Sequence, residues 1–172
     1  MNAIRTLFTS LLLWSVVTGA TAEVNEIIGF QNYKFGLTIK QVLEIDELVS
    51  TSANDDGQWF NTRRKTTILG ENYTQSLLFG PDGKLKQVNV FREFEGGDIA
   101  CSGAFEEAFG AIRATYGNAD QPPDRTVHGG ISAITTARFT HSNGSSVRLS
   151  SVFISGCLIN VAYTAGTDGS GF

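Results

Sequence analysis

Six segments with the alternation of a β-strand constrain the fold of this chain more than any other feature of its sequence. Within each one, apolar and polar residues alternate or β-branched residues accumulate, and turn-forming residues separate the segments. Strands of this kind favour an antiparallel sheet with one apolar face. The predicted strands span residues 59–69, 73–79, 85–94, 131–141, 147–153 and 158–164.

Two turn signals predict β-hairpins. The sequence Gly80-Pro81-Asp82-Gly83 places proline second in the turn and glycine where a left-handed backbone is needed. The pair Asn143-Gly144 suits a two-residue hairpin turn. By contrast, residues 118–130 contain Pro122-Pro123 and Gly129-Gly130 and predict a long surface loop.

Two further segments have helical periodicity. In residues 102–116, apolar side chains recur every three or four positions, and Gly117 is expected to end the helix. A first helix is predicted to begin at Thr38, where Thr38 and Gln41 match a capping box and Leu37 can pack on Val42. We expect this first helix to run to about Val49. The apolar stripe of the second helix consists of Phe105, Ala108, Phe109, Ile112 and Tyr116.

These elements together predict an α+β fold. Their order is helix, three strands, helix, three strands, which suggests two tandem helix-plus-three-strand units at 35–94 and 98–165 within a single domain, 23–165. Because neither helix can bury its stripe alone, both helices are expected to pack on one face of the antiparallel sheet. Residues 166–172 form a Gly-rich tail that we expect to be flexible.

The N-terminus has the pattern of a secretory signal peptide, residues 1–22. Arg5 precedes a short apolar stretch, 7–17, and small residues follow at Ala20 and Ala22. Cleavage after Ala22 would leave 172 minus 22, or 150, residues. The apolar stretch is shorter than a stable transmembrane helix requires. We therefore expect a secreted or periplasmic protein with no membrane span after cleavage.

Export determines how the two cysteines are interpreted. Thiols form disulfides in oxidising compartments, so Cys101 and Cys157 are expected to pair. The chain-entropy model assigns a closed loop of this length about 4 kcal/mol of stabilisation. Two free buried cysteines are the alternative. A zinc site is disfavoured, because two isolated cysteines lack the close spacing of zinc ligands.

Two stretches resemble a known group of small exported proteins. The helix start Tyr33-Lys34-Phe35-Gly36-Leu37-Thr38-Ile39-Lys40-Gln41-Val42, the hairpin Leu77-Leu78-Phe79-Gly80-Pro81-Asp82-Gly83-Lys84-Leu85 and the order of elements are similar to α-β-β-β modules of the β-lactamase inhibitory protein-like and outer-membrane assembly lipoprotein-like type. This resemblance implies an inhibitor-like role, in which the open face of the sheet binds another protein and catalyses nothing.

Charge and motifs narrow the functional classes. A net charge of −4 gives no general attraction to nucleic acid. No cofactor or metal motif and no recognisable catalytic constellation is present in the sequence. One alternative is a small hydrolase whose site lies in the 118–130 loop, with His128 oriented by Asp120 or Asp124. Another is a carrier that holds a small apolar ligand between helix and sheet, since the chain has 12 Phe.

The strongest candidate for recognition is the basic strand that follows Trp59. In an extended strand, Trp59, Arg63 and Lys65 would share one face and combine an aromatic anchor with cations, as protein-binding hot spots do. Alternatively, Trp59 packs under the neighbouring loop. The sequence thus predicts an exported, non-catalytic protein-binding module, either an inhibitor, an immunity-type factor or an envelope accessory protein, whose partner is another exported or envelope protein. Further cations that strand register could bring together are Lys86, Arg92, Arg138 and Arg148.

Overall fold

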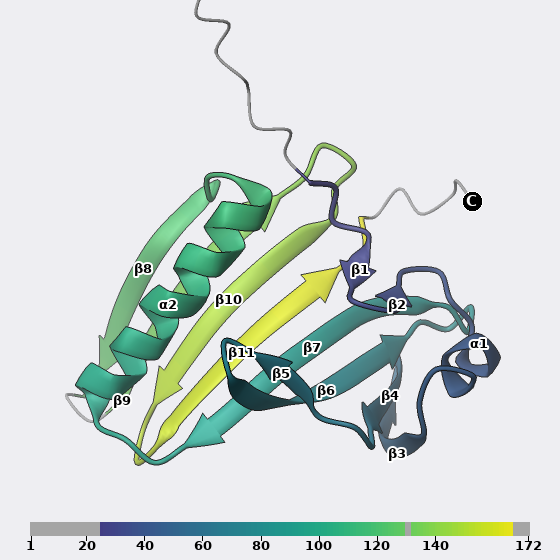
Figure 1. Cartoon of the computed structure of the whole chain (residues 1–172), viewed down its shortest axis with the longest axis horizontal. Coiled ribbons are helices and arrows are strands. Elements are labelled where there is room, and N and C mark those ends of the chain that lie inside the picture. The colour runs from purple at the N-terminus through teal and green to yellow at the C-terminus, as the bar shows by residue number, and fades with distance from the viewer. Residues whose placement is uncertain (1–24, 130–131, 167–172) are drawn as a thin grey trace, which may run out of the picture.

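The computed structural model describes residues 25–129 and 132–166 (Figure 1). The predicted signal peptide and all but the first residue of the Gly-rich tail lie outside the described residues. The helices are α1 (Ile39–Leu43) and α2 (Asp98–Tyr116). The strands are β1 (Gly29–Phe30), β2 (Tyr33–Lys34), β3 (Leu48–Asn54), β4 (Gly57–Thr62), β5 (Thr66–Ile68), β6 (Glu71–Phe79), β7 (Leu85–Phe94), β8 (Gln121–His128), β9 (Ser132–Thr140), β10 (Ser146–Phe153) and β11 (Cys157–Thr164).

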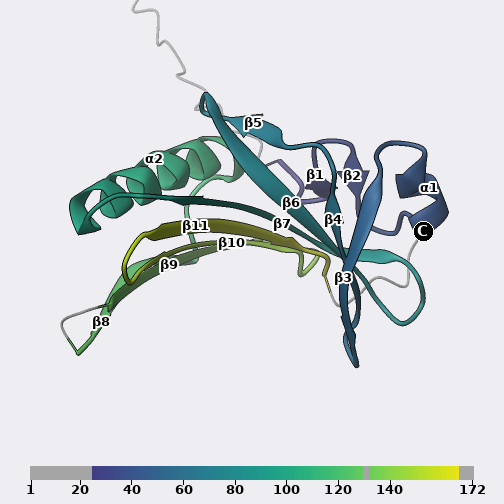
Figure 2. The ribbon, with the colours of Figure 1, turned by 90° about the horizontal axis from the view of Figure 1, so that it is seen from below.

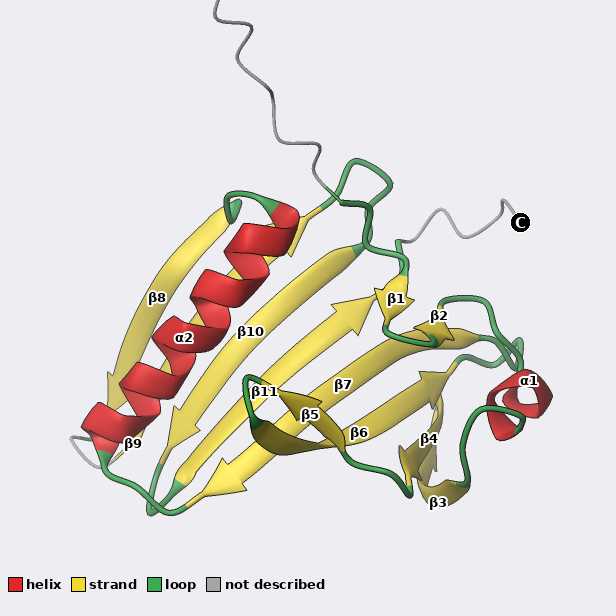
Figure 3. Ribbon diagram, in the orientation of Figure 1, coloured by secondary structure: helices red, strands yellow, loops and turns green. Residues whose placement is uncertain are grey.

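One wide antiparallel sheet dominates the molecule (Figure 3). Its strand order is β3-β4-β6-β7-β11-β10-β9-β8, and β5 pairs with β6 beside this path. Strands β7 and β11 pair in the middle, so they join the part of the sheet that precedes α2 to the part that follows it. The predicted α+β class with a mostly antiparallel sheet is confirmed. The tandem helix-plus-three-strand units are not confirmed, because five strands follow α1 and four follow α2.

Helix α2 covers one face of the sheet, over β9, β10 and β11 (Figure 1). Its apolar stripe faces the sheet as the sequence predicts: Phe105, Ala108 and Ile112 are buried, and Phe109 and Tyr116 are half-buried. The helix begins earlier than the periodicity of 102–116 indicates, at Asp98, and it ends before Gly117 as expected. Among the described residues, neither helix has both the length and the apolar character needed to cross a bilayer.

A disulfide between Cys101 and Cys157 confirms the predicted pairing, with 5.4 Å between their Cα atoms. Cys101 lies near the start of α2, and Cys157 is the first residue of β11. The bond therefore attaches the helix to the sheet that it covers. Both cysteines are 2% exposed and belong to the same core cluster as Phe105.

Both predicted hairpins form. In each hairpin, a backbone hydrogen bond joins two residues with three turn residues between them: Gly80 with Lys84, and His141 with Ser145. The Asn143-Gly144 turn is thus one residue longer than predicted. Gly83 and Gly144 have φ angles of 71° and 80°, a conformation that glycine adopts without strain.

The first helix is shorter than predicted. Thr38 and Gln41 form the expected capping box, but α1 ends at Leu43 and residues 48–54 form strand β3. The buried carboxylate of Asp46 accepts a hydrogen bond from the Tyr33 hydroxyl, 3.1 Å away, and one from its neighbour's backbone N–H. These bonds favour a turn here over continuation of the helix. Helical periodicity in the sequence does not reveal that preference.

Two strand predictions also need correction. Residues 59–69 form two strands, because the chain leaves the sheet between Thr62 and Thr66. Residues 121–128, predicted as part of a loop, form β8 instead. Proline lacks a backbone donor, but β8 is an edge strand, and its register shifts between Gln121 and Asp124 to accommodate Pro122-Pro123.

Candidate functional site

The face of the sheet opposite α2 is the first candidate surface. Helix α1 and the β1–β2 segment lie on the same side as α2, and no described helix lies on the other (Figure 2). The outer parts of the sheet, at the β3–β4 hairpin and at β8, bend toward this uncovered side (Figure 2). We call this side the open face and the side under α2 the covered face.

Strand register determines which side chains share the open face. Leu149 pairs with Val161 and Ala137, which are all buried under α2, so the neighbouring residue Ser150 faces the opposite side. The same alternation, followed strand by strand from the paired positions, yields a largely polar face. Its central positions are Asn61, Ser76, Asn89, Phe91, Asn160, Ala162, Ser150, Arg148, Thr136, Arg138 and Gln121, of which Phe91 and Ala162 are apolar.

Two apolar groups lie toward opposite ends of this polar centre. On one side Trp59 of β4 pairs with Leu78 of β6, and both are half-buried. On the other, Leu158 pairs with Val152, which pairs in turn with Ile134. The open face thus combines a hydrogen-bonding centre with apolar anchors, a composition found in protein interfaces.

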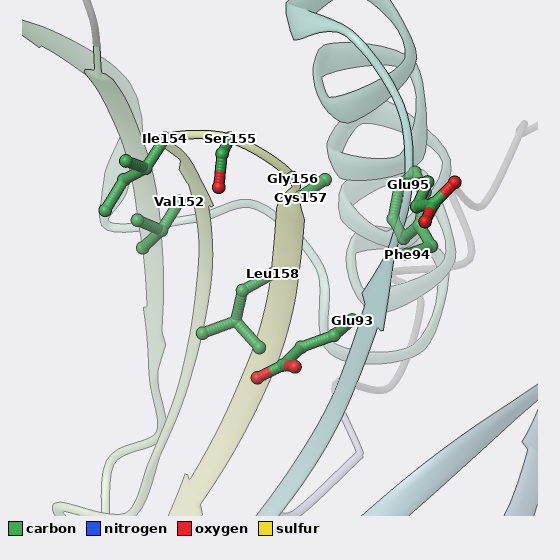
Figure 4. Close-up of a pocket in the computed structure, with 9 residues that line it drawn as sticks. All are labelled: Glu93, Phe94, Glu95, Val152, Ile154, Ser155, Gly156, Cys157 and Leu158. Atoms are coloured by element: carbon green, nitrogen blue, oxygen red, sulfur yellow. The ribbon is translucent and has the colours of Figure 1, made fainter.

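An open cavity of about 610 Å³ adjoins the second apolar group (Figure 4). Val152, Ile154 and Leu158 line one wall. The carboxylate of Glu93 lies beside Leu158, whereas that of Glu95 points away (Figure 4). The cavity could receive an apolar side chain of a partner. Ser155 also lines it, but no histidine does.

The structure separates the three residues predicted as a protein-binding site. Trp59 lies on the open face, but β4 ends at Thr62, so strand alternation does not carry Arg63 and Lys65 onto that face. Arg63 forms an ion pair with Glu47 at the surface. Lys65 lies exposed between β4 and β5. Of the three, Trp59 is therefore the one placed on the open face.

Register also decides which of the other cations converge. Arg138 and Arg148 are directly opposite each other on β9 and β10, and both are exposed on the open face. Arg92 lies on the covered face, 4.7 Å from the centre of the Phe94 ring. Lys86 is bound to Asp82 at 2.9 Å. Of these four cations, Arg138 and Arg148 are therefore the two that strand register brings together on the open face.

The histidine and carboxylates of the hydrolase hypothesis do not come together. His128 pairs with Ser132 at one end of β9, while Asp120 accepts a hydrogen bond from Thr140 at the other end, 3.0 Å away. About eight residues of strand separate these points, or ~26 Å. Asp124 lies about four residues from His128 along β8, or ~13 Å. No group of three potential metal-binding side chains occurs among the described residues.

A second cavity, of about 300 Å³, lies on the covered side between α2 and the β1 and β5 segments. Its walls are mostly apolar and include Ala111, Ile112 and Ile68. Tyr116 and Tyr163 also line it, and burial raises the pKa of both hydroxyls above the ordinary value of 10.0. This cavity lies between helix and sheet, where a carrier of a small apolar ligand would need one.

Comparison with protein-family models, with curated proteins and with solved structures found no match to this chain. The fold and the candidate site therefore define only a class: an α+β protein with one disulfide-attached helix and an uncovered sheet face.

The sequence pattern does not single out most of the open-face residues. Ser150, Asn160 and Asn89 are polar residues in the middle of strands, where either face could have been the apolar one. Nor does the turn signal reveal the arginine pair. A two-residue Asn143-Gly144 turn would pair positions whose numbers sum to 287, whereas the observed three-residue turn pairs positions that sum to 286, as 138 and 148 do.

Proposed function

We propose that this chain is an exported, non-catalytic protein-binding module that holds a partner against the open face of its sheet. The partner would be another secreted or envelope protein, and the module would act as an inhibitor, an immunity-type factor or an envelope accessory protein. The observation that carries the proposal is the uncovered side of the long antiparallel sheet.

The size and composition of the open face support this proposal. Trp59 on β4 and Arg148 on β10 are about four strand spacings apart, or ~19 Å, which suits a standard interface of ~800 Å² on each partner. Aromatic and arginine side chains are enriched in such interfaces. The disulfide holds α2 over the other face and so keeps the sheet rigid, which lowers the entropic cost of binding.

Two sequence-based inferences belong to the same proposal. The signal peptide would direct the chain to an oxidising compartment, with which the disulfide is compatible. The half-units 35–94 and 98–165 would be a structural repeat, since β3-β4-β6-β7 and β8-β9-β10-β11 both run from an outer edge of the sheet to its centre. The resemblance to β-lactamase inhibitory protein-like modules implies the same use of the open face.

Site-specific photocrosslinking in the producing cells tests the proposal. A photoreactive residue at Asn160, in the middle of the open face, is compared with one at Ala114, exposed on α2. We expect a defined protein adduct from position 160 and none from position 114. Absence of a protein adduct at position 160, or equal adducts at both positions, would contradict the proposal.

A second candidate function, carriage of a small apolar ligand, is favoured by the 300 Å³ cavity beside α2. Its lining of Ile68, Ile112 and neighbouring apolar side chains suits an acyl or aromatic group. The test is binding of an environment-sensitive apolar dye. Ala111→Trp, which fills the cavity, should abolish binding, whereas Ala114→Trp, exposed on the same helix, should preserve it. Equal dye binding by both variants would exclude this site.

A further inference from the structure

We propose that Arg138 and Arg148 form an anion-recognition site on the open face, and that its occupant is an acidic segment of the partner protein. Their Cα atoms are direct register partners on β9 and β10. This inference rests on the proposed function, since it specifies the chemistry of the partner that the open face would bind.

These two arginines differ from the others in the described part of the chain. Four arginines, Arg63, Arg64, Arg92 and Arg125, have a carboxylate partner. Arg113 lies 6.0 Å from the centre of the Phe109 ring on α2. Among described residues, Arg138 and Arg148 form no ion pair, although the chain has an excess of acidic residues.

Their placement is unfavourable for the free protein. Like charges directly opposite each other on neighbouring strands are destabilising. The sheet does not require charged residues here, because uncharged Thr136 and Ser150 occupy the next open-face pair on β9 and β10. Asp124 lies diagonally across from Arg138 but forms no ion pair with it, so an external anion that binds both guanidinium groups would offset their repulsion.

The neighbouring side chains fit a carboxylate-bearing ligand. Gln121 pairs with Arg138 on one side, and Ala162 pairs with Arg148 on the other. Ala162 is only 3% exposed, so its methyl group lies beneath neighbouring side chains and offers Arg148 no polar partner. Nearby Ser150 and Asn160 offer further hydrogen-bond donors, and each guanidinium can bind a carboxylate through two parallel hydrogen bonds.

The same surface is poorly suited to a polyanion. A nucleic acid or an anionic membrane needs an extended basic area, whereas the open face also carries the carboxylates of Glu93 and Asp124. The apolar groups around Trp59 and Leu158 have no counterpart on a phosphate backbone. A protein segment with one or two carboxylates, flanked by apolar residues, matches both the cations and the apolar anchors.

The test uses the full chain with a photocrosslinker at Asn160 in three backgrounds. These are the unchanged sequence, the double variant Arg138→Gln with Arg148→Gln, and the control Arg113→Gln, which removes an exposed arginine from α2. We expect the double variant to reduce the protein adduct at least tenfold and the control to leave it within twofold. Mass spectrometry of the adduct should locate the crosslink beside Asp or Glu residues of the partner.

Each other outcome has a distinct meaning. An adduct that persists in the double variant overturns the arginine site but leaves the proposed function intact. Absence of a protein adduct in the unchanged sequence contradicts the proposed function itself. An arginine-dependent adduct with lipid or nucleic acid overturns the acidic protein segment as occupant. Thermal melting of all three proteins establishes that a lost adduct does not reflect unfolding.

Discussion

The two faces of the sheet are built from the same strands but differ in the polarity and burial of their side chains. On β10, Leu149 is fully buried under α2, while the next residue, Ser150, lies on the open face. The covered face is mainly apolar and holds the disulfide and the aromatic contacts of Phe109 with Phe105 and Phe139. The open face is mainly polar and places Arg138 opposite Arg148.

This difference separates stability from recognition. Apolar burial on the covered face supplies the folding free energy, so its residues are constrained by packing. The open face contributes little to folding and is free to carry side chains selected for another purpose. Matched substitutions on the two faces can therefore test whether the covered face supplies stability and the open face is free for binding.

The largest expected effect comes from removing the bond that holds α2 on the covered face. Replacing Cys101 and Cys157 together by serine should lower the free energy of unfolding by about 4 kcal/mol, because the unfolded chain gains the entropy of a long open loop. Denaturant titration of the oxidised protein and the double variant measures this. A change below about 1 kcal/mol would mean that packing alone keeps the helix in place.

Truncation of one core side chain should have the next largest effect. Leu149→Ala should lower the free energy of unfolding by about 3 kcal/mol, since it removes buried methyl groups and leaves a cavity. Ser150→Ala, one residue along and on the open face, should change it by less than about 0.5 kcal/mol. Similar losses in both variants would show that the two faces are equally buried and that neither is left free for a partner.

Alkaline pH should act through the covered side. All four tyrosines, Tyr33, Tyr73, Tyr116 and Tyr163, lie there, and burial raises the pKa of each above 10.0. The folded protein retains these phenolic protons after the unfolded chain has lost them, so stability should fall as the pH rises above about 10. Tyr163→Phe should reduce the slope of melting temperature against pH. An unchanged slope in this variant would contradict the assignment to Tyr163.

The smallest expected changes in the free energy of unfolding come from two arginine substitutions, one on each face, and they should have opposite signs. Arg148→Thr should raise the free energy of unfolding by about 0.5 kcal/mol, since it removes a like charge opposite Arg138. Arg125→Thr should lower it by about 0.5 kcal/mol, because Arg125 binds Asp98 of α2 at 2.7 Å. Paired thermal melts at low salt would resolve the signs. A loss in Arg148→Thr equal to that in Arg125→Thr would mean that Arg148 has a stabilising partner.

Sequence pattern predicted the elements whose local signals agree with their tertiary role. The apolar stripe of α2, both hairpins and the cysteine pair are confirmed. It failed where tertiary context overrides local preference. Pro122-Pro123 indicates a loop, yet an edge strand tolerates missing donors. Helix α1 ends early where the Asp46 carboxylate is buried against Tyr33.

The candidate site was harder to predict than the fold. The residue type of Trp59 indicates a binding role, but the sequence groups Arg63 and Lys65 with it only if one strand runs through all three, and that strand ends at Thr62. Arg138 and Arg148 are ten positions apart in sequence, and only hairpin register brings them opposite each other. Local composition cannot reveal a site that is assembled across strands.

Solvent accessibility of individual side chains tests the openness of the face opposite α2 most directly. In an NMR measurement with a soluble paramagnetic chelate, side-chain protons of Thr136 and Ser150 should relax strongly, while the methyl groups of Leu149 and Val161 should be protected. Protection of Thr136 and Ser150 equal to that of Leu149 and Val161 in the isolated protein would contradict an open face, because it would mean that something already covers the surface assigned to a partner.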